Sequence, residues 1–242
     1  MAHFKQTCIE LKQIPLYHIF SEKILNNIPV LKINESVIRK VVETTFLGVT
    51  LQANLSWHSH ITNITNKLNK YCSILYLTRN SLTKNSMKII YNSIIYSQIT
   101  YCNVIWGKLK KIHLHKLEVA QKRIVRTIMY RSKYAHTNLD FINLQILKIK
   151  EINIYFSSLF VYKSIHNLSY PIAYFSYADH HDYNLRNIQK LRTPFSRSLQ
   201  GQTSPSIYTS NIWNNLPQQI REKPTLFSFR SSVKRHLLSK YS

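Results

Sequence analysis

The segment that decides the fold runs from Thr45 to Arg131. It opens with Thr45-Phe46-Leu47-Gly48-Val49 and closes with Ala120-Gln121-Lys122-Arg123-Ile124-Val125-Arg126. Between these two ends, apolar residues recur three and four positions apart, a spacing that predicts amphipathic helices. We therefore interpret the residues before this segment as a lead-in and those after it as a helical extension.

Three helices are predicted inside this segment. The first begins after Trp57, and its buried face is expected to comprise Ile61, Ile64, Leu68, Tyr71, Cys72 and Leu75. Thr83 is a suitable N-cap for the second helix. The inward residues of the second helix are expected to be Met87, Ile90, Tyr91, Ile94 and Ile95. Those of the third are expected to be Leu114, Leu117, Gln121, Ile124 and Ile128, and together the helices form a compact unit.

Extended segments are predicted before the helices. β-Branched runs on either side of Asn34-Glu35-Ser36 indicate a hairpin. A third extended run, from Thr45 to Leu51, contains Gly48, where we expect a bulge or the close approach of another backbone. The predicted fold class is therefore mainly α, with a small N-terminal β-hairpin or sheet followed by the three-helix unit and a C-terminal helical extension.

Changes in composition and periodicity divide the chain further. We expect a poorly defined edge (1–27), a β-hairpin region (28–56), the helical unit (57–133), a helical pair (134–168), a loop or linker (169–205) and C-terminal helices (206–242). The apolar residues of the helical pair are Phe141, Leu144, Leu147, Ile152, Tyr155, Phe156, Leu159 and Tyr162. The closing helices are predicted at 207–216, around Trp213, and at 225–241, with Phe229, Val233 and Leu237.

The charge balance points to a polyanionic partner. The formal net charge is +23 and the sequence pI is about 10.0. Lys and Arg release the counterions condensed on phosphates, so RNA or DNA is the first candidate. A membrane-surface protein, a ribosomal-type protein, or charge acquired by drift in an AT-biased genome are the alternatives. The three cysteines form no C-x-x-C pair, which favours a reducing, intracellular location in the nucleus or cytoplasm, and we expect no secretion and no membrane span.

The third predicted helix carries a basic face. Lys116, Arg123 and Arg126 are spaced i, i+7 and i+10, so they share one side, and Lys122 flanks them. Glu118 is the only acidic residue from Gly107 to Lys133. A solvated face is the alternative interpretation. The predicted phosphate-binding residues are Lys67, Lys70, Lys108, Lys110, Lys111, Lys116, Lys122, Arg123, Arg126 and Arg131.

No catalytic constellation is evident. The pairs His58/His60, His113/His115 and His180/His181 lack the additional ligands of a metal site. Tyr177-Ala178-Asp179-His180 resembles an aromatic-Ala-Asp-Asp box, but a two-metal centre needs convergent carboxylates and the second acid is missing. The first aspartate of the chain is Asp140. We predict no catalytic residue, no metal, no cofactor and no small-molecule substrate.

Ordered motifs across about residues 28 to 240 resemble the downstream part of a non-LTR (LINE-type) retrotransposon reverse transcriptase. The central motifs are Phe46-Leu47-Gly48-Val49, Leu55-x-Trp57-x-x-His60-Ile61, Tyr101-Cys102-x-x-x-Trp106-Gly107 and Leu117-x-x-x-Gln121-Lys122-Arg123-Ile124-x-Arg126. The later motifs are Ala135-His136-Thr137, Tyr183-Asn184-Leu185-Arg186, Ile212-Trp213-Asn214-x-Leu216-Pro217 and Phe229-x-x-x-Val233-Lys234-x-x-Leu237-Leu238.

The resemblance implies specific roles for parts of this chain. Phe46, Leu47 and Gly48 would belong to the primer-grip hairpin, and residues 57 to about 131 to the helical thumb that closes over the template–primer duplex. The fingers, the catalytic palm and the endonuclease of that family have no counterpart here, so the chain is expected to be a truncated fragment without a polymerase active site. The implied partner is RNA or DNA, foremost an RNA–DNA duplex, bound without sequence preference.

Three alternatives remain open. The chain could support RNA-directed DNA polymerase activity as an accessory thumb in a larger protein. It could be a repurposed helical interaction module, or a relic that does not fold stably. The sequence does not determine the oligomeric state.

Overall fold

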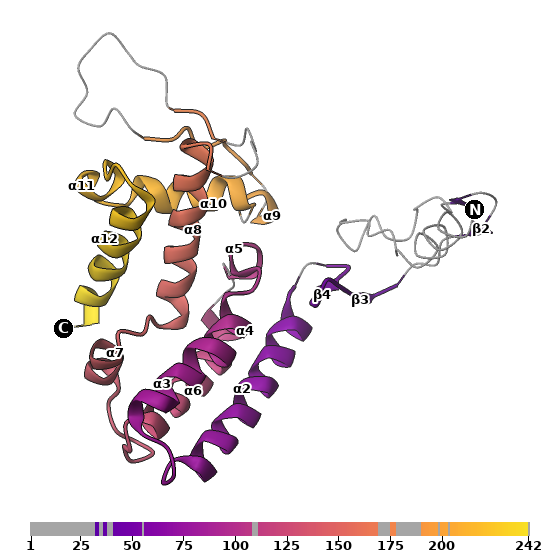
Figure 1. Ribbon diagram of the computed structural model, residues 1–242. Coiled ribbons are helices and arrows are strands. Elements are labelled where there is room, and N and C mark those ends of the chain that lie inside the picture. Colours follow the sequence, from indigo (N-terminus) through magenta and orange to yellow (C-terminus); the bar gives the residue numbers. More distant parts are fainter. Residues whose placement is uncertain are drawn as a thin grey trace, which may run out of the picture. The chain divides into compact units, whose positions relative to one another are not determined.

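The structure is a computed structural model that describes residues 32–33, 36–37, 41–54, 56–107, 111–168, 175–177, 190–197, 199–202 and 204–241. The predicted edge at 1–27 lies outside the described residues. The chain divides into two compact units, Met1–Asn63 and Ile64–Ser242. The described part is mostly helical, with short antiparallel β-structure near its start (Figure 1), which confirms the predicted fold class.

Two separate two-stranded sheets lie in the first unit. Strand β1 (Lys32–Ile33) pairs antiparallel with β2 (Ser36–Val37), as the predicted hairpin requires. Strand β3 (Glu43–Phe46) pairs antiparallel with β4 (Val49–Gln52). The prediction of a single strand from Thr45 to Leu51 is therefore wrong. Leu47 and Gly48 both have positive φ, 46° and 78°, which suits a tight two-residue hairpin turn rather than a bulge.

The β3–β4 hairpin is tied to the first turns of helix α2 (His58–Thr78). The backbone N–H of Thr50 donates to Nδ1 of His60 at 3.3 Å, and Nδ2 of Asn63 donates to Oγ1 of Thr50 at 3.2 Å. The N–H of Ser59 donates to Oε1 of Gln52 at 3.1 Å, which satisfies a backbone donor at the helix start. His60 thus has a packing role against the hairpin.

Helix α2 buries most of the side chains that its periodicity predicted. Among the residues expected on the buried face, Ile61, Ile64, Leu68, Cys72 and Leu75 are buried. The remaining one, Tyr71, is half-buried. The three- and four-residue spacing therefore predicted the inward face of α2 correctly except at its margin.

The second predicted helix has a π-helical turn in its middle. Helix α3 (Lys84–Ile90) leads into η2 (Tyr91–Ile95) and then α4 (Tyr96–Thr100). Thr83 is its N-cap, as predicted, and accepts a hydrogen bond from the N–H of Ser86 at 3.1 Å. The fully buried residues are Met87, Tyr91, Ile95 and Ile99.

The π turn explains one error in the predicted core. Ile94 was expected to point inward, but its side chain is exposed, and Ile90 is only half-buried. A π turn contains more residues than an α turn, so the inward face continues at four-residue spacing from Tyr91 to Ile95. The α-helical period therefore misplaces Ile94.

Helix α6 (Lys111–Ile128) follows the short helix α5 (Asn103–Trp106). All of its predicted inward residues are buried, namely Leu114, Leu117, Gln121, Ile124 and Ile128. The Gln121 amide is fully used: Nε2 donates to the carbonyl of Leu147 at 2.8 Å and to Oη of Tyr91 at 2.9 Å, and Oε1 accepts from the N–H of Ile149 at 3.1 Å. This polar contact joins the three-helix unit to the segment that follows it.

The predicted helical pair is present as α7 (Asn138–Leu144) and α8 (Ile149–Ile165). Phe141, Leu144, Leu147, Ile152, Leu159 and Tyr162 are buried, whereas Tyr155 and Phe156 are half-buried. Leu147 lies in the connection between the two helices rather than in either of them.

Five short elements complete the second unit: α9 (Leu199–Gln202), α10 (Pro205–Asn214), α11 (Gln218–Arg221), α12 (Leu226–Leu238) and η3 (Ser239–Tyr241). Helices α10 and α12 correspond to the two predicted closing helices, whereas α9 and α11 were not predicted. Both α10 and α12 pack on α8, and we call these three helices the C-terminal bundle (Figure 1). Most of the predicted linker lies outside the described residues. Among the residues that the structure describes, no helix is long and apolar enough to cross a membrane.

Candidate nucleic-acid interface

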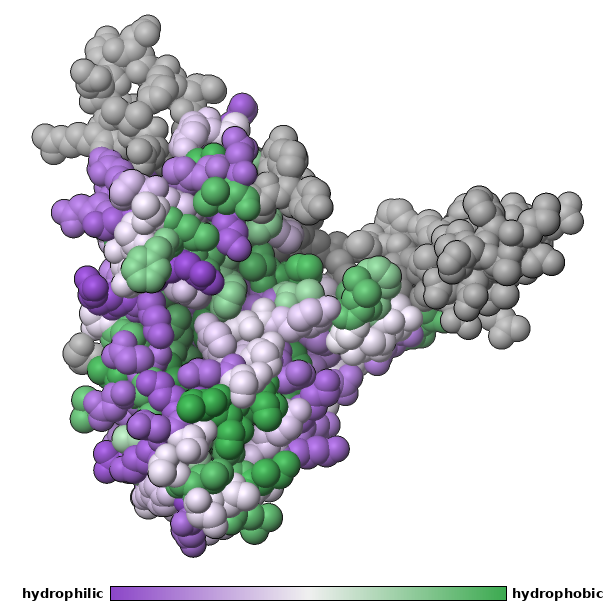
Figure 2. Space-filling model, in the orientation of Figure 1, coloured by the Kyte–Doolittle hydropathy of each residue, from purple (hydrophilic) through white to green (hydrophobic). Residues whose placement is uncertain are grey.

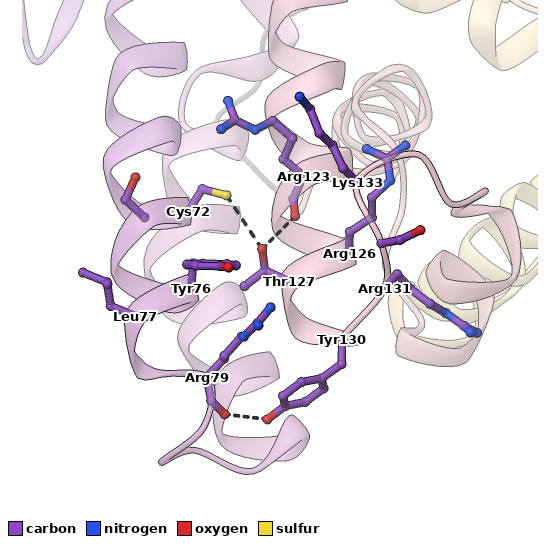
Figure 3. Close-up of a pocket in the computed structure, with 12 residues that line it drawn as sticks. Cys72, Tyr76, Leu77, Arg79, Arg123, Arg126, Thr127, Tyr130, Arg131 and Lys133 are labelled. Atoms are coloured by element: carbon purple, nitrogen blue, oxygen red, sulfur yellow. Dashed lines mark hydrogen bonds between the residues drawn. The ribbon is translucent and has the colours of Figure 1, made fainter.

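An open cavity of about 800 Å³ lies between α2 and α6, and we call it the α2–α6 groove (Figure 3). Its lining residues come from the second half of α2, the turn after α2, the second half of α6 and the turn after α6: Cys72, Ser73, Tyr76, Leu77, Arg79, Arg123, Arg126, Thr127, Tyr130, Arg131, Ser132 and Lys133. The groove lies entirely within the second unit.

Small side chains form the floor of the groove. Sγ of Cys72 lies 3.9 Å from Oγ1 of Thr127, and this hydroxyl donates to the backbone carbonyl of Arg123 at 3.0 Å. Both residues are buried. Both side chains are short, and the cavity lies above them between the two helices.

One end of the groove is closed by Tyr130. Its hydroxyl donates to the backbone carbonyls of Arg79 and Leu82, and the bond to Leu82 measures 3.2 Å. These carbonyls belong to the turn after α2, so the bonds join the end of α6 to the end of α2 (Figure 3). Tyr130 itself has a positive φ of 54°, which turns the chain out of the helix.

Positive charge dominates the lining. Arg79, Arg123, Arg126, Arg131 and Lys133 contribute to it, and no aspartate or glutamate does. Nη1 of Arg123 donates to Oδ1 of Asn69 at 3.4 Å, and Nε of Arg126 donates to the backbone carbonyl of Ala135 at 2.9 Å. Both acceptors are neutral, so they orient the two guanidinium groups without cancelling their charges.

Arg131 differs from the other groove cations. Its Nε lies 3.2 Å from Oδ1 of the buried Asp140, and this is the one salt bridge within the described part of the chain. Figure 3 shows its side chain directed away from Arg123 and Arg126. Arg131 therefore lines the groove, but its charge is partly neutralised by Asp140.

Two tyrosines stand beside these cations. Tyr76 is 55% exposed and Tyr130 is 44% exposed. Cζ of Arg79 lies 4.3 Å from the centroid of the Tyr76 ring, and Nζ of Lys84 lies 5.8 Å from the centroid of the Tyr130 ring. Cation–π contacts hold the cations over ring faces, so one end of the groove offers flat, positively charged surface.

The structure brings only part of the predicted phosphate-binding set into the groove. Arg123, Arg126 and Arg131 line it. Lys67, Lys70 and Lys116 are exposed outside it, and Nζ of Lys67 donates to Oε1 of Gln98 at 3.3 Å. Lys108 and Lys110, and the side chain of Lys111, lie outside the described residues.

Lys122 faces a different neighbourhood, at the start of α8. Burial lowers the pKa of Lys148, Glu151 opposes that change, and the positive charge of Lys122 lowers the pKa of Lys148 further. Lys122 is therefore close enough to Lys148 for their charges to repel. It flanks the basic face, as predicted, but does not line the groove.

The predicted primer-grip residues lie at the tip of the β3–β4 hairpin in the first unit. Phe46 and Leu47 are exposed large apolar residues, and Leu47 and Gly48 form the turn. Phe46, which precedes the turn, and Leu47 within it are exposed, whereas Val49, which follows the turn, is buried.

Sequence reasoning missed Tyr76, Arg79 and Tyr130. Tyr76 lies in the last turn of α2 and Arg79 follows its last residue, Thr78, and their three-position spacing was an available signal. Tyr130 lies two residues beyond the end of α6, and its role depends on carbonyls about fifty residues earlier in the chain. No local pattern reports such a contact.

Nothing in the described residues suggests metal chemistry, since no group of three or more His, Cys, Asp or Glu side chains there could hold an ion. Of the Tyr177-Ala178-Asp179-His180 segment, Tyr177 forms an isolated bridge with Leu191, and the other three residues are not among those described. What the groove offers is cationic and aromatic surface, which suits an anionic and planar ligand.

The chain has no match among protein-family models, curated proteins or solved structures.

Proposed function

We propose that the chain binds nucleic acid through its phosphates, without sequence preference, using the α2–α6 groove and the exposed face of α6. The uniform sign of its charge carries the proposal. Glu118 is the only acidic residue from Thr44 to Leu139, and no carboxylate lines the groove. A face that merely keeps a protein soluble mixes both signs, whereas a phosphate-binding surface concentrates one.

The kind of cation also favours nucleic acid. Four of the groove cations are arginines, Arg79, Arg123, Arg126 and Arg131. A planar guanidinium donates two parallel hydrogen bonds to a phosphate and stacks on flat groups.

The resemblance to non-LTR reverse transcriptases makes the proposal more specific. On that resemblance the chain is a fragment that holds a template–primer duplex, with its helical unit in the place of the thumb and without a polymerase active site. Two features support this version: the positive groove within the helical unit, and the exposed apolar tip of the β3–β4 hairpin.

Salt-dependent binding tests the proposal. A fluorescein-labelled RNA–DNA duplex is titrated with the whole chain, and anisotropy is followed from about 50 to about 200 mM salt. The logarithm of the binding constant should fall linearly with the logarithm of salt concentration, by about 0.9 for each phosphate contacted. Binding that ignores salt, or no binding at low salt, would overturn the proposal.

A matched pair of variants locates the surface. Lys116, Arg123 and Lys133 are exposed on or beside the groove, and Lys150, Arg230 and Lys240 are exposed elsewhere. Replacing each trio with Gln removes the same charge. The first variant should lower affinity and reduce the salt slope by up to about three, one for each lost contact. Equal losses in both variants would show that net charge alone drives binding.

A further inference from the structure

The ring of Tyr76 has no evident role in folding, and Tyr130, whose hydroxyl joins the end of α6 to the end of α2, is still 44% exposed. Tyr76 lies on α2 with more than half of its side chain in solvent, and the residue is helical but not inward. A single exposed aromatic side chain is ordinary on a protein surface. Two of them in a cavity whose charged lining residues are all cations suit a ligand that is both planar and anionic.

The ring of Tyr130 is held by hydrogen bonds, and the ring of Tyr76 lies against a guanidinium group. The hydroxyl of Tyr130 donates to two carbonyls, of Arg79 and Leu82, which restricts its ring. One face of Tyr76 is covered by the guanidinium of Arg79 at 4.3 Å. We call Tyr76, Arg79 and Tyr130 the platform, and Figure 3 shows them below the heads of Arg123, Arg126 and Lys133.

This arrangement matches the parts of a nucleotide. A base stacks on aromatic rings and on arginine planes, and a phosphate is bound by guanidinium and ammonium groups. The volume of about 800 Å³ falls within the range of sites that enclose small ligands, and it has room for a nucleotide. A base inside a duplex has both of its faces covered by neighbours, so only an unpaired base could use the platform.

We infer that the α2–α6 groove binds unpaired nucleotides of single-stranded RNA or DNA. The base stacks on the platform of Tyr76, Arg79 and Tyr130, and the adjoining phosphates contact Arg123, Arg126 and Lys133. The inference rests on the proposed function, since it assigns one part of the nucleic-acid-binding surface to a strand that has left the duplex. A duplex with a single-stranded overhang would contact both the groove and the exposed face of α6.

The experiment compares two ligands and three variants of the whole chain. The ligands are a short labelled single strand of mixed sequence and a blunt duplex of the same length, at one salt concentration. The variants are Tyr76→Leu, Tyr76→Phe and, as the matched control, Phe227→Leu. Phe227 is 83% exposed, lies on α12 and does not line the groove.

Loss of stacking should weaken the binding of the single strand and not that of the duplex. Tyr76→Leu keeps an apolar side chain without a π face, so single-strand affinity should fall about tenfold while duplex affinity changes less than about twofold. Tyr76→Phe should retain single-strand affinity, and Phe227→Leu should leave both affinities unchanged. A single strand with abasic sites throughout should bind weakly and equally to the wild type and Tyr76→Leu.

The outcomes separate this inference from the function on which it rests. If the wild type binds both ligands and Tyr76→Leu lowers neither affinity, or lowers both equally, the inference is wrong and phosphate binding stands. If the wild type binds neither ligand, the proposed function itself fails. Circular dichroism of each variant verifies that the helices are retained.

Discussion

The C-terminal bundle and the α2–α6 groove use aromatic side chains in opposite ways. In the bundle, the rings of Tyr162 and Phe229 are stacked with centroids 4.3 Å apart, and Trp213 lies 5.7 Å from Phe229. All three are buried. In the groove, Tyr76 and Tyr130 face cations and solvent. The bundle aromatics therefore stabilise the fold, whereas those of the groove remain available to a ligand.

Polar groups show the same division. Nδ2 of Asn153, on α8, donates to the carbonyl oxygen and to Oδ1 of Asn103, both at 3.1 Å, and Oδ1 of Asn153 accepts from the hydroxyl of Tyr208. Each polar atom of this amide is used within the protein. The guanidinium groups of Arg123 and Arg126 contact only neutral acceptors through one nitrogen each, and their remaining donors can face a phosphate.

The largest expected difference separates two phenylalanines of α12. Phe229 is fully buried, and Phe229→Ala should lower the free energy of unfolding by about 3–5 kcal/mol through lost burial and a cavity. Phe227 is 83% exposed on the same helix, and Phe227→Ala should change it by less than about 0.5 kcal/mol. Urea denaturation followed by circular dichroism measures both. Similar losses would mean that the bundle is not packed as described.

The two faces of α6 give the next largest effect. Gln121→Leu removes the partners of the Ile149 N–H, the Leu147 carbonyl and the Tyr91 hydroxyl, all buried, and should destabilise the fold by about 2–3 kcal/mol. Arg123→Gln, on the groove face, should leave stability almost unchanged and weaken nucleic-acid binding. Denaturation and anisotropy titrations of the two variants should therefore show opposite patterns. A stability loss in Arg123→Gln would give that face a structural role.

Alkaline pH should lower the free energy of unfolding through two half-buried tyrosines, Tyr96 on α4 and Tyr208 on α10, which are helices that pack on α8. Burial raises the pKa of Tyr96 and of Tyr208 to about 12, above the ordinary value of about 10. The unfolded chain loses these protons first, so stability is unchanged below about pH 10 and falls as the pH rises toward 12. Urea midpoints measured across this interval give the slope, and Tyr208→Phe should reduce it. An unchanged slope in Tyr208→Phe would contradict the role of that burial.

The smallest expected effect on stability belongs to the groove platform. Tyr76→Leu should change the free energy of unfolding by less than about 0.5 kcal/mol, because the ring is exposed and leaves no cavity. Tyr162→Leu, at a buried ring of the bundle, should lower it clearly. Thermal unfolding of the pair is the measurement. If Tyr76→Leu proves as costly as Tyr162→Leu, the ring at Tyr76 is a structural part of the fold.

Local periodicity was sufficient to predict the helices and most of their buried faces. The inward residues of α6, including the polar Gln121, and the N-cap Thr83 could be read from spacing and from hydrogen-bonding capacity alone. The failures occurred where the backbone departs from a regular period. Ile94 is displaced by a π turn, and Gly48 belongs to a hairpin turn rather than to a strand.

The candidate site was predictable only in part, for a related reason. Arg123 and Arg126 share a helical face, so their spacing predicted a positive surface. The cavity needs Cys72 opposite Thr127 and Tyr130 bonded to the end of α2, contacts between residues about fifty positions apart. Charge counts along the chain carry no information about which long-range pairs leave space between them.

The sequence by itself determined a strongly basic, mainly helical chain with a continuous positive face, because charge and helical period are properties of neighbouring residues. Only the tertiary structure decided that some of those cations stand around a groove with Tyr76 and Tyr130, whereas Lys122 and Lys116 do not line it. The physical reason is that packing of α2 on α6 sets which side chains face one another, and the small floor residues Cys72 and Thr127 set how much room remains above them.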